Sequence, residues 1–181
     1  TQLEIMGANA KNASVFLRTA GSKKDDALLA IAKALREHSD EIIKANEIDI
    51  ENGKNAGLTE SLLDRLRLTP ERINGMAEGV EQVAALADPI GNVLEGRTLK
   101  NGLNIEKVRV PMGVIGIIFE ARPNVTSDAA ALCLKAGSAV ILRGGKEAIN
   151  SNLAVSEIMR NAVESVGFPK DCIALVKDTS R

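Results

Sequence analysis

Residues 113–146, GVIGIIFEARPNVTSDAAALCLKAGSAVILRGGK, decide the fold. Two continuous apolar runs in this stretch flank a segment with helical periodicity, and the same alternation continues toward the end of the chain. The expected strands are 114–119, 139–142 and 173–176, and the expected helices are 127–135 and 147–166. Gly137 and Gly167 stand where helices commonly end. Continuous apolar strands that alternate with helices form parallel sheets covered on both faces, so the sequence predicts an α/β fold.

The residues before this stretch are expected to form a helical layer, because apolar residues recur at three- and four-residue spacing with charges between them. One apolar stripe consists of Leu28, Leu29, Ala32 and Leu35. Ser22 and Asp25 precede it in the form of a capping box. A second run, 42–50, follows Ser39 as the expected N-cap and is expected to end at Asn52-Gly53. A third helix is predicted after Thr69 as N-cap, with Pro70 at its first position.

Between Asn92 and Val110 the apolar period changes to two, and Asn101-Gly102 is a typical hairpin turn. The strands of this predicted β-hairpin are rather polar, so we expect it to project from the core. An isolated two-stranded ribbon is marginally stable in water and exposes unpaired edges. We therefore expect residues 92–110 to mediate self-association.

These patterns divide the chain into three expected parts. They are a helical part at 1–91, a β-hairpin at 92–110, and at 111–181 the first half of a parallel Rossmann-like sheet. A doubly wound sheet normally continues beyond its third parallel strand, so we expect this chain to be a piece of a longer protein.

Polar residues follow the first two strands, at the sheet edge where such folds bind ligands. Glu120, Arg122 and Asn124 follow the first strand, and Arg143-Gly144-Gly145-Lys146 follows the second. The two glycines allow close approach to a ligand, and the two cations suit phosphate. Two structural alternatives remain open: a helix-capping turn in which Asn124 or Thr126 satisfies backbone groups, and a Gly-Gly turn with two solvated bases.

Several kinds of catalytic site are excluded or disfavoured by the residues. A kinase-like phosphate loop fails because Val140 and Glu147 occupy positions that require Gly and Ser or Thr, and no G-x-G-x-x-G fingerprint is present. Cys133 and Cys172 are interpreted as buried small hydrophobic residues. His38 is expected at the surface, and no metal-ligand spacing appears.

Composition excludes further classes. Lys+Arg 23 against Asp+Glu 24 gives a net charge of −1, and aromatic residues are 2%, so neither a basic surface nor stacking rings favour nucleic acid. No apolar run approaches the roughly 20 residues that span a membrane. Two cysteines without a visible secretory signal favour the reducing cytoplasm.

Two strings, EARPNVT at 120–126 and AVILRGGKE at 139–147, resemble gamma-glutamyl phosphate reductase, also called glutamate-5-semialdehyde dehydrogenase, of the aldehyde dehydrogenase superfamily. LLDRL at 62–66 and LTPER at 68–72 are similar to the same family, so the resemblance covers essentially the whole chain. It implies an aldehyde-dehydrogenase-like fold and NADPH-dependent reduction of L-glutamyl 5-phosphate to L-glutamate 5-semialdehyde with release of phosphate. This is a step of proline biosynthesis in the cytoplasm, which makes glutamate 5-kinase a candidate partner and the hairpin the expected element of a homo-oligomer.

The resemblance also assigns residues. Asn124 matches the asparagine that donates to the oxyanion, and Arg143, Gly144, Gly145 and Lys146 match the strand end that meets the adenosine ribose. Lys146 occupies a position where NAD-using relatives often carry an acid, and a cation suits the 2′-phosphate, so NADP(H) is the expected cofactor. The family's catalytic cysteine lies in a second domain and matches neither cysteine here, so this chain alone is expected to be inactive.

Two rival functions remain. A non-catalytic NADP-binding or assembly module would keep the cofactor half and lack the catalytic half. An amino-acid kinase of the same pathway is disfavoured by the absence of a convincing phosphate loop.

Overall fold

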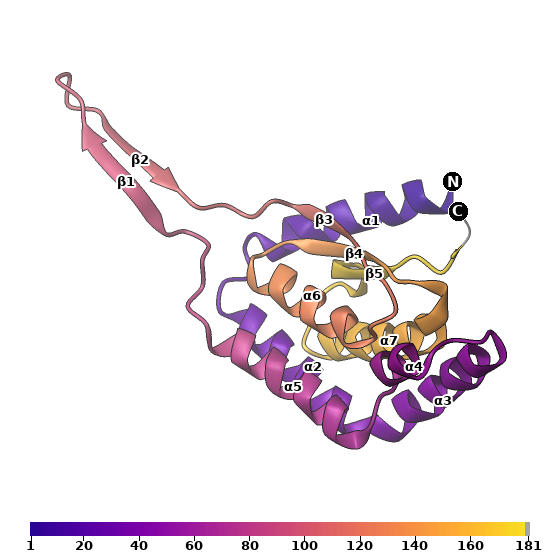
Figure 1. Ribbon diagram of the computed structural model, residues 1–181. Helices are drawn as coiled ribbons and strands as arrows, with labels where there is room; N and C mark the ends of the chain where they lie inside the picture. The colour runs from indigo at the N-terminus through magenta and orange to yellow at the C-terminus, as the bar shows by residue number, and fades with distance from the viewer. Residues whose placement is uncertain (180–181) are drawn as a thin grey trace.

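The computed structural model, in which residues 1–179 are described, is organised around a three-stranded parallel sheet (Figure 1). The sheet order is β3 (Val114–Ile118), β4 (Ala139–Arg143) and β5 (Ile173–Leu175). One face is covered by α1 (Gln2–Leu17), and the other by α6 (Asn124–Lys135) and α7 (Ile149–Ser165). The predicted α/β fold and its parallel strand pairing are confirmed.

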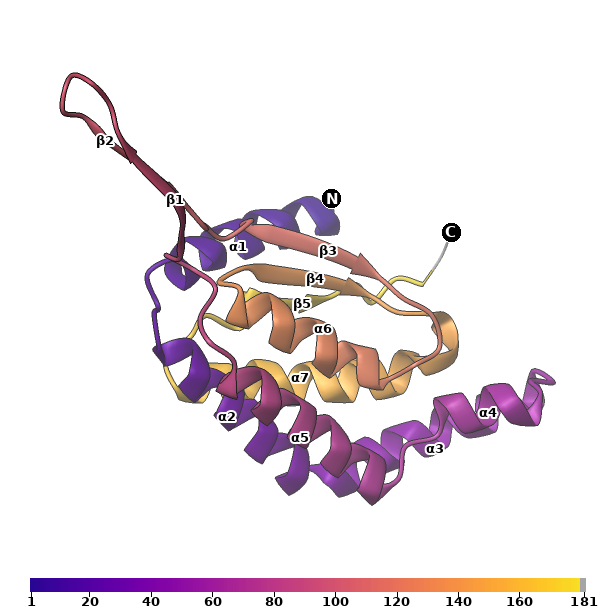
Figure 2. The ribbon, with the colours of Figure 1, turned by 60° about the vertical axis from the view of Figure 1, so that its left-hand side comes forward.

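A further helical layer packs on α6 and α7 (Figure 2). The remaining elements are α2 (Lys23–Glu37), α3 (Ser39–Asn55), α4 (Glu60–Leu66), α5 (Pro70–Ala85), β1 (Val93–Thr98) and β2 (Asn104–Val108), with 3-10 turns at Lys146–Ala148 and Lys170–Cys172. Apolar residues of α2, α5, α6, α7 and the sheet form one continuous core. Within residues 1–179, none of the helices is both long and apolar enough to span a membrane.

Glycines end α6 and α7 as the sequence predicts. Gly137 directly follows the C-cap residue of α6, and Gly167 directly follows that of α7. Their φ angles are +66° and +87°. Residues with a Cβ rarely adopt this conformation. These two glycines therefore set the lengths of α6 and α7 and the points where β4 and the β5 segment begin.

The first strand is less buried than expected. In β3 alternate residues are exposed, and Ile118 is 78% exposed. The physical reason is that β3 pairs only with β4 among the described strands, so it is an edge of the three-stranded sheet.

The α2 helix follows the predicted apolar pattern with two corrections. Leu28, Ala32 and Leu35 are buried, but Leu29 is half exposed, because the buried stripe continues through Ile31 instead. The expected capping box is also absent: Ser22 has helical dihedral angles and its side chain makes no capping hydrogen bond.

The α3 helix passes through Asn52-Gly53 rather than ending there, and its N-cap is His38 rather than Ser39. Gly53 is needed for packing instead of for a break, since a Cβ at this position would lie 2.9 Å from Leu58 Cδ1. The predicted start of α5 is confirmed, because Thr69 Oγ1 accepts a hydrogen bond from Arg72 N at 3.2 Å and Pro70 is the first helical residue.

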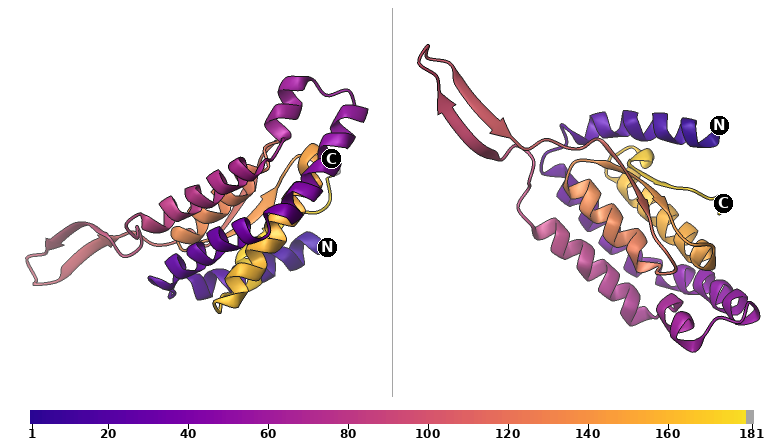
Figure 3. Two further views of the ribbon diagram at one scale, coloured as in Figure 1. Left: turned by 90° about the horizontal axis from the view of Figure 1, so that it is seen from below. Right: turned by 45° about the horizontal axis from the view of Figure 1, so that its top comes forward.

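The β1–β2 hairpin projects far from the body of the protein, as Figure 3 shows from two sides. The strands pair antiparallel, and every residue of both is exposed. Gly102 in the turn has φ of +88°, which agrees with the predicted Asn101-Gly102 turn.

Two buried lysines tie the helical layer together near the base of the hairpin. Lys24 Nζ donates to Asp88 Oδ1 at 2.9 Å and to Lys135 O at 3.0 Å. Lys135 Nζ donates to Asp25 Oδ1 at 2.6 Å and to Ala84 O at 2.8 Å. Each ammonium thus satisfies a carbonyl at the C-terminus of one helix and is neutralised by one carboxylate. The pair fixes α2, α5 and α6 relative to one another.

Candidate functional site

A cleft of about 810 Å³ opens at the carboxyl ends of β3 and β4, and we call it the strand-end cleft. Its lining residues are Leu58, Leu62, Ile118, Phe119, Glu120, Ala121, Arg143, Gly144, Gly145, Lys146, Glu147 and Thr179. The structure therefore brings the four predicted cofactor-binding residues together in one hollow, where the sequence places them.

The first of the two glycines in this cleft is required by the protein's own packing. A Cβ on Gly144 would collide with Asn152 Nδ2 and would lie 3.2 Å from the Phe119 ring. A Cβ on Gly145 would lie 2.7 Å from Glu147 Oε2, which is the flexible end of that side chain, and at ordinary contact distance from the backbone that follows β3. Gly144 thus lets the turn after β4, the ring of Phe119 after β3 and the start of α7 approach one another, whether or not a ligand is bound.

The position of this turn depends on a buried carboxylate that sequence reasoning missed. Asp49 of α3 is 1% exposed. Its carboxylate accepts hydrogen bonds from Asn150 N at 3.1 Å, Asn150 Nδ2 at 2.7 Å, Ser151 N at 2.7 Å and Ser151 Oγ at 2.6 Å. Free N–H groups and the helix dipole make a helix N-terminus favourable for a carboxylate. Asp49 therefore fixes the start of α7 just after Lys146.

Two buried asparagines extend this polar network. Asn46 Nδ2 donates to Leu66 O at 2.8 Å and to Ser151 Oγ at 3.0 Å, and its Oδ1 accepts from Leu68 N at 2.8 Å. Asn152 Oδ1 accepts from Thr126 Oγ1 at 3.0 Å, while its Nδ2 has no partner among the described residues. The starts of α5, α6 and α7 are consequently linked through side chains.

Asn124 lies outside the strand-end cleft, in a second hollow of about 440 Å³ that we call the arginine cleft. This cleft is lined by Asp64, Arg65, Arg67, Leu68, Arg72, Gly75, Met76, Arg122, Asn124 and Asp128. The loop between β3 and α6 separates the two clefts, because its residues 119–121 line the first and Arg122 lines the second.

The helix-capping alternative for Asn124 is wrong. Asn124 is the first residue of α6, the N-cap is Pro123, and no side-chain capping bond is made there. Instead Asn124 Nδ2 donates to Asp128 Oδ2 at 3.0 Å, one turn further along the helix. Loss of water around the Asp128 carboxyl raises its pKa, although hydrogen bonds from Asn124 and Ser127 act in the opposite direction. Thr126 likewise bonds Asn152 rather than capping backbone groups.

The two cysteines are buried, which agrees with their interpretation as small hydrophobic residues. Burial raises the pKa of the Cys133 thiol to about 11 and that of Cys172 to about 12. A nucleophilic thiolate needs a lowered pKa and access to solvent. His38 is at the surface, where its Nδ1 lies 3.2 Å from Glu41. Among residues 1–179, no three or more His, Cys, Asp or Glu side chains gather as a metal site would require.

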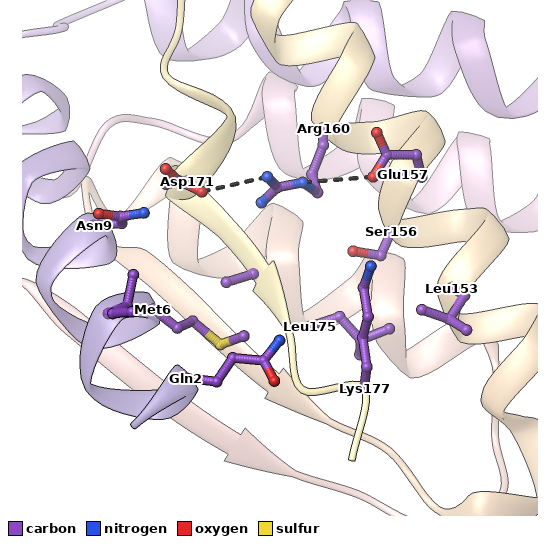
Figure 4. Close-up of a pocket in the computed structure, with 12 residues that line it drawn as sticks. Gln2, Met6, Asn9, Leu153, Ser156, Glu157, Arg160, Asp171, Leu175 and Lys177 are labelled. Carbon is purple, nitrogen blue, oxygen red and sulfur yellow. Dashed lines mark hydrogen bonds and ion pairs between the residues drawn. The ribbon is translucent and has the colours of Figure 1, made fainter. Parts of the chain in front are cut away.

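A third hollow, of about 540 Å³, lies between α1, α7 and β5 (Figure 4). Arg160 points into it, but its guanidinium is held by Asp171 at 3.3 Å, Glu157 at 3.7 Å and the carbonyls of Lys170 and Ile173. Its charge therefore stabilises the segment leading into β5. No sequence motif had indicated this hollow.

The fold agrees with comparison to known proteins. The chain belongs to the aldehyde dehydrogenase family, whose pattern matches residues 2–181. Members of this family use NAD or NADP. Within it, the chain is similar to gamma-glutamyl phosphate reductase of Clostridium beijerinckii, with 53% identity over 182 residues, which cover 100% of this chain and 44% of that protein.

Solved structures give the same result. The gamma-glutamyl phosphate reductase of Thermotoga maritima matches with a TM-score of 0.98 and 40% identity, over 100% of this chain and 44% of that one. The Saccharomyces cerevisiae protein of the same name matches with a TM-score of 0.93 and 34% identity, over 99% and 47% respectively. The resemblance inferred from the motifs is confirmed, and the chain spans about 44% of the length of the curated relative.

Proposed function

We propose that this chain is the cofactor-binding part of a gamma-glutamyl phosphate reductase, which reduces L-glutamyl 5-phosphate with NADPH to L-glutamate 5-semialdehyde and phosphate. The observation that carries the proposal is the 53% identity to a reductase of that name across the whole chain. Such an enzyme would serve proline biosynthesis in the cytoplasm.

The strand-end cleft is proposed to hold NADP(H), whose nicotinamide supplies the hydride. Its residues fit a dinucleotide, because apolar side chains such as Leu62 and Phe119 flank cationic ones at the carboxyl edge of a parallel sheet. Lys146 is exposed and supplies positive charge suited to the 2′-phosphate of NADP(H). Arg143 lies at the end of β4 in the same cleft.

Asn124 is proposed to donate a hydrogen bond to the oxyanion that forms when a thiolate adds to the acyl carbon. One N–H of its amide is directed to Asp128, which orients the group and leaves the second N–H available. A fixed donor at a developing oxyanion lowers the barrier more than it stabilises the substrate.

The thiolate itself is proposed to come from outside the described residues. Cys133 and Cys172 are buried and have raised pKa values, so neither is suited to attack an acyl phosphate. A polypeptide limited to residues 1–181 is accordingly expected to lack reductase activity.

The β1–β2 hairpin is proposed to join copies of the protein. All of its strand residues are exposed, including Val93, Leu94, Ile105 and Val108. Burial of these apolar side chains and unpaired strand edges by another copy would stabilise a ribbon that is marginal alone. Glutamate 5-kinase, which would supply the unstable acyl phosphate, is the proposed partner enzyme.

The reverse reaction tests the proposed activity. The full-length gene product is mixed with glutamate 5-semialdehyde and NADP⁺, and NADPH is followed with and without inorganic phosphate. We expect NADPH to form only when phosphate is present, and a protein limited to residues 1–181 to form none. No phosphate-dependent NADPH formation by the full-length protein would refute the proposed function.

A further inference from the structure

The arginine cleft gathers more positive charge than its own acids neutralise. Four arginines line it, whereas only two acidic residues, Asp64 and Asp128, do so. Like charges held around one hollow repel each other, and an anionic ligand relieves this repulsion.

The contacts separate the structural arginine from the others. Arg72 donates to Asp64 O, to Arg67 O at 2.8 Å and to Asp64 Oδ1 at 2.9 Å, so it fastens the segment between α4 and α5. Asp64 is therefore already neutralised. Within residues 1–179, the guanidinium groups of Arg65, Arg67 and Arg122 make no hydrogen bond or ion pair.

The remaining acid of the cleft can offset at most one of these three cations. Asp128 accepts a hydrogen bond from Asn124 at 3.0 Å, and it forms no ion pair with an arginine of the described residues 1–179. The three unpaired guanidinium groups face the same hollow as the Asn124 amide. Arg122 lies in the loop before α6, two residues ahead of Asn124, whereas Arg65 and Arg67 come from the end of α4.

We propose that the arginine cleft binds the two anionic ends of an amino-acyl phosphate, with Arg122 pairing with the phosphate and Arg65 and Arg67 with the α-carboxylate. This proposal rests on the proposed function. The phosphate is bonded to the same carbon as the acyl oxygen assigned to Asn124, so it must lie near that residue and Arg122. The α-carboxylate lies at the other end of the molecule and reaches the α4 side. Guanidinium groups suit both anions because they form paired hydrogen bonds with them.

Steady-state kinetics of the full-length protein, in the reverse direction, separates the two ends. Inorganic phosphate and glutamate 5-semialdehyde are varied independently for Arg122→Gln, Arg65→Gln and Arg67→Gln. A charge-assisted hydrogen bond contributes roughly 1.5–3 kcal/mol, so each loss should raise a KM about tenfold or more. We expect Arg122→Gln to raise the KM for phosphate, and the other two to raise the KM for the semialdehyde.

Two controls separate binding from folding. Arg18→Gln removes an exposed arginine at the end of α1, outside the arginine cleft, and should leave both KM values within about twofold. The KM for NADP⁺ and the melting temperature should be unchanged in all four variants.

The outcomes distinguish failure of the two proposals. A wild-type protein without phosphate-dependent activity would refute the proposed function, and the arginine assignment with it. An active wild-type protein whose three cleft variants match Arg18→Gln in both KM values would overturn the arginine assignment alone, and the arginines would then be ordinary solvated surface charges.

Discussion

Replacing Asp49 with Ala is expected to lower the free energy of unfolding by about 3–5 kcal/mol. The side chain is 1% exposed and accepts four hydrogen bonds, from two backbone amides and two side chains at the start of α7. Removing the carboxylate leaves these donors without a partner in a place that water does not reach, and each unsatisfied buried group costs about 1–3 kcal/mol. Ser151 and Asn150 can partly relax toward other partners, so the total loss of stability is smaller than the sum of the costs of the four separate groups.

Urea denaturation followed by circular dichroism measures this effect, because the chain has no Trp or Tyr to report by fluorescence. The matched control is Glu47→Ala, an exposed position on the same helix, which should change stability by no more than about 0.5 kcal/mol. The stability of Asp49→Asn should lie between those of Asp49→Ala and Glu47→Ala. Asparagine keeps the side-chain volume and one acceptor oxygen, but it directs an NH₂ group toward other donors.

Asp49→Ala should also affect ligand binding in the strand-end cleft. Asp49 fixes the start of α7 beside Lys146, so Asp49→Ala is expected to weaken NADPH binding while Glu47→Ala does not. If Asp49→Ala were as stable as Glu47→Ala, the reasoning about this buried network would be refuted.

Three further predictions concern the cofactor, the hairpin and acid stability. Lys146→Glu should weaken binding of NADP(H) much more than that of NAD(H), measured as the two dissociation constants; equal losses would remove Lys146 from 2′-phosphate recognition. Deleting residues 100–104 should reduce the assembly size measured by light scattering, and an unchanged size in a folded protein would contradict the role of the hairpin. Burial alone would raise the pKa of Asp88, but hydrogen bonds from Lys24 and Ile90 N, with the charges of Lys24 and Lys135, hold it below its ordinary 3.8. Between the lowered pKa of the folded state and the ordinary value, the unfolded state therefore binds more protons than the folded state. The contribution of Asp88 to the free energy of unfolding is complete above about pH 4 and is lost as the pH falls through the lowered pKa. Asp88→Asn should be less stable than wild type at pH 7, with a gap that narrows on acidification; a gap independent of pH between 2 and 7 would contradict this.

The fold was predictable where local pattern and tertiary structure agree. The apolar strands, the glycines at 137 and 167 and the Asn101-Gly102 turn each act through backbone geometry that neighbouring residues determine. The start of α5 was likewise predictable from Thr69 and Pro70, because both residues act on the backbone of the first helical turn. These features determine the order of the secondary-structure elements and the position of the strand-end cleft.

Features that depend on distant partners were not predictable. Asp49 and Lys24 lie in helices among other charged residues and resemble solvated positions, yet they bond to groups 101 and 111 residues away. Gly53 resembles a helix breaker until Leu58 is found packed against it. The separation of Asn124 from the Gly-Gly turn was missed for the same reason, because sequence order does not show on which side of the β3–α6 loop each side chain lies.

The turnover number of Asn124→Ala in the full-length protein tests the account most directly. If Asn124 donates to the oxyanion, kcat for phosphate-dependent NADP⁺ reduction should fall by on the order of 10² to 10³, while the KM for NADP⁺ and the denaturation midpoint stay close to wild type. Turnover within a few-fold of wild type, with or without a change in stability, would contradict the assignment of the arginine cleft as the place where the acyl group reacts.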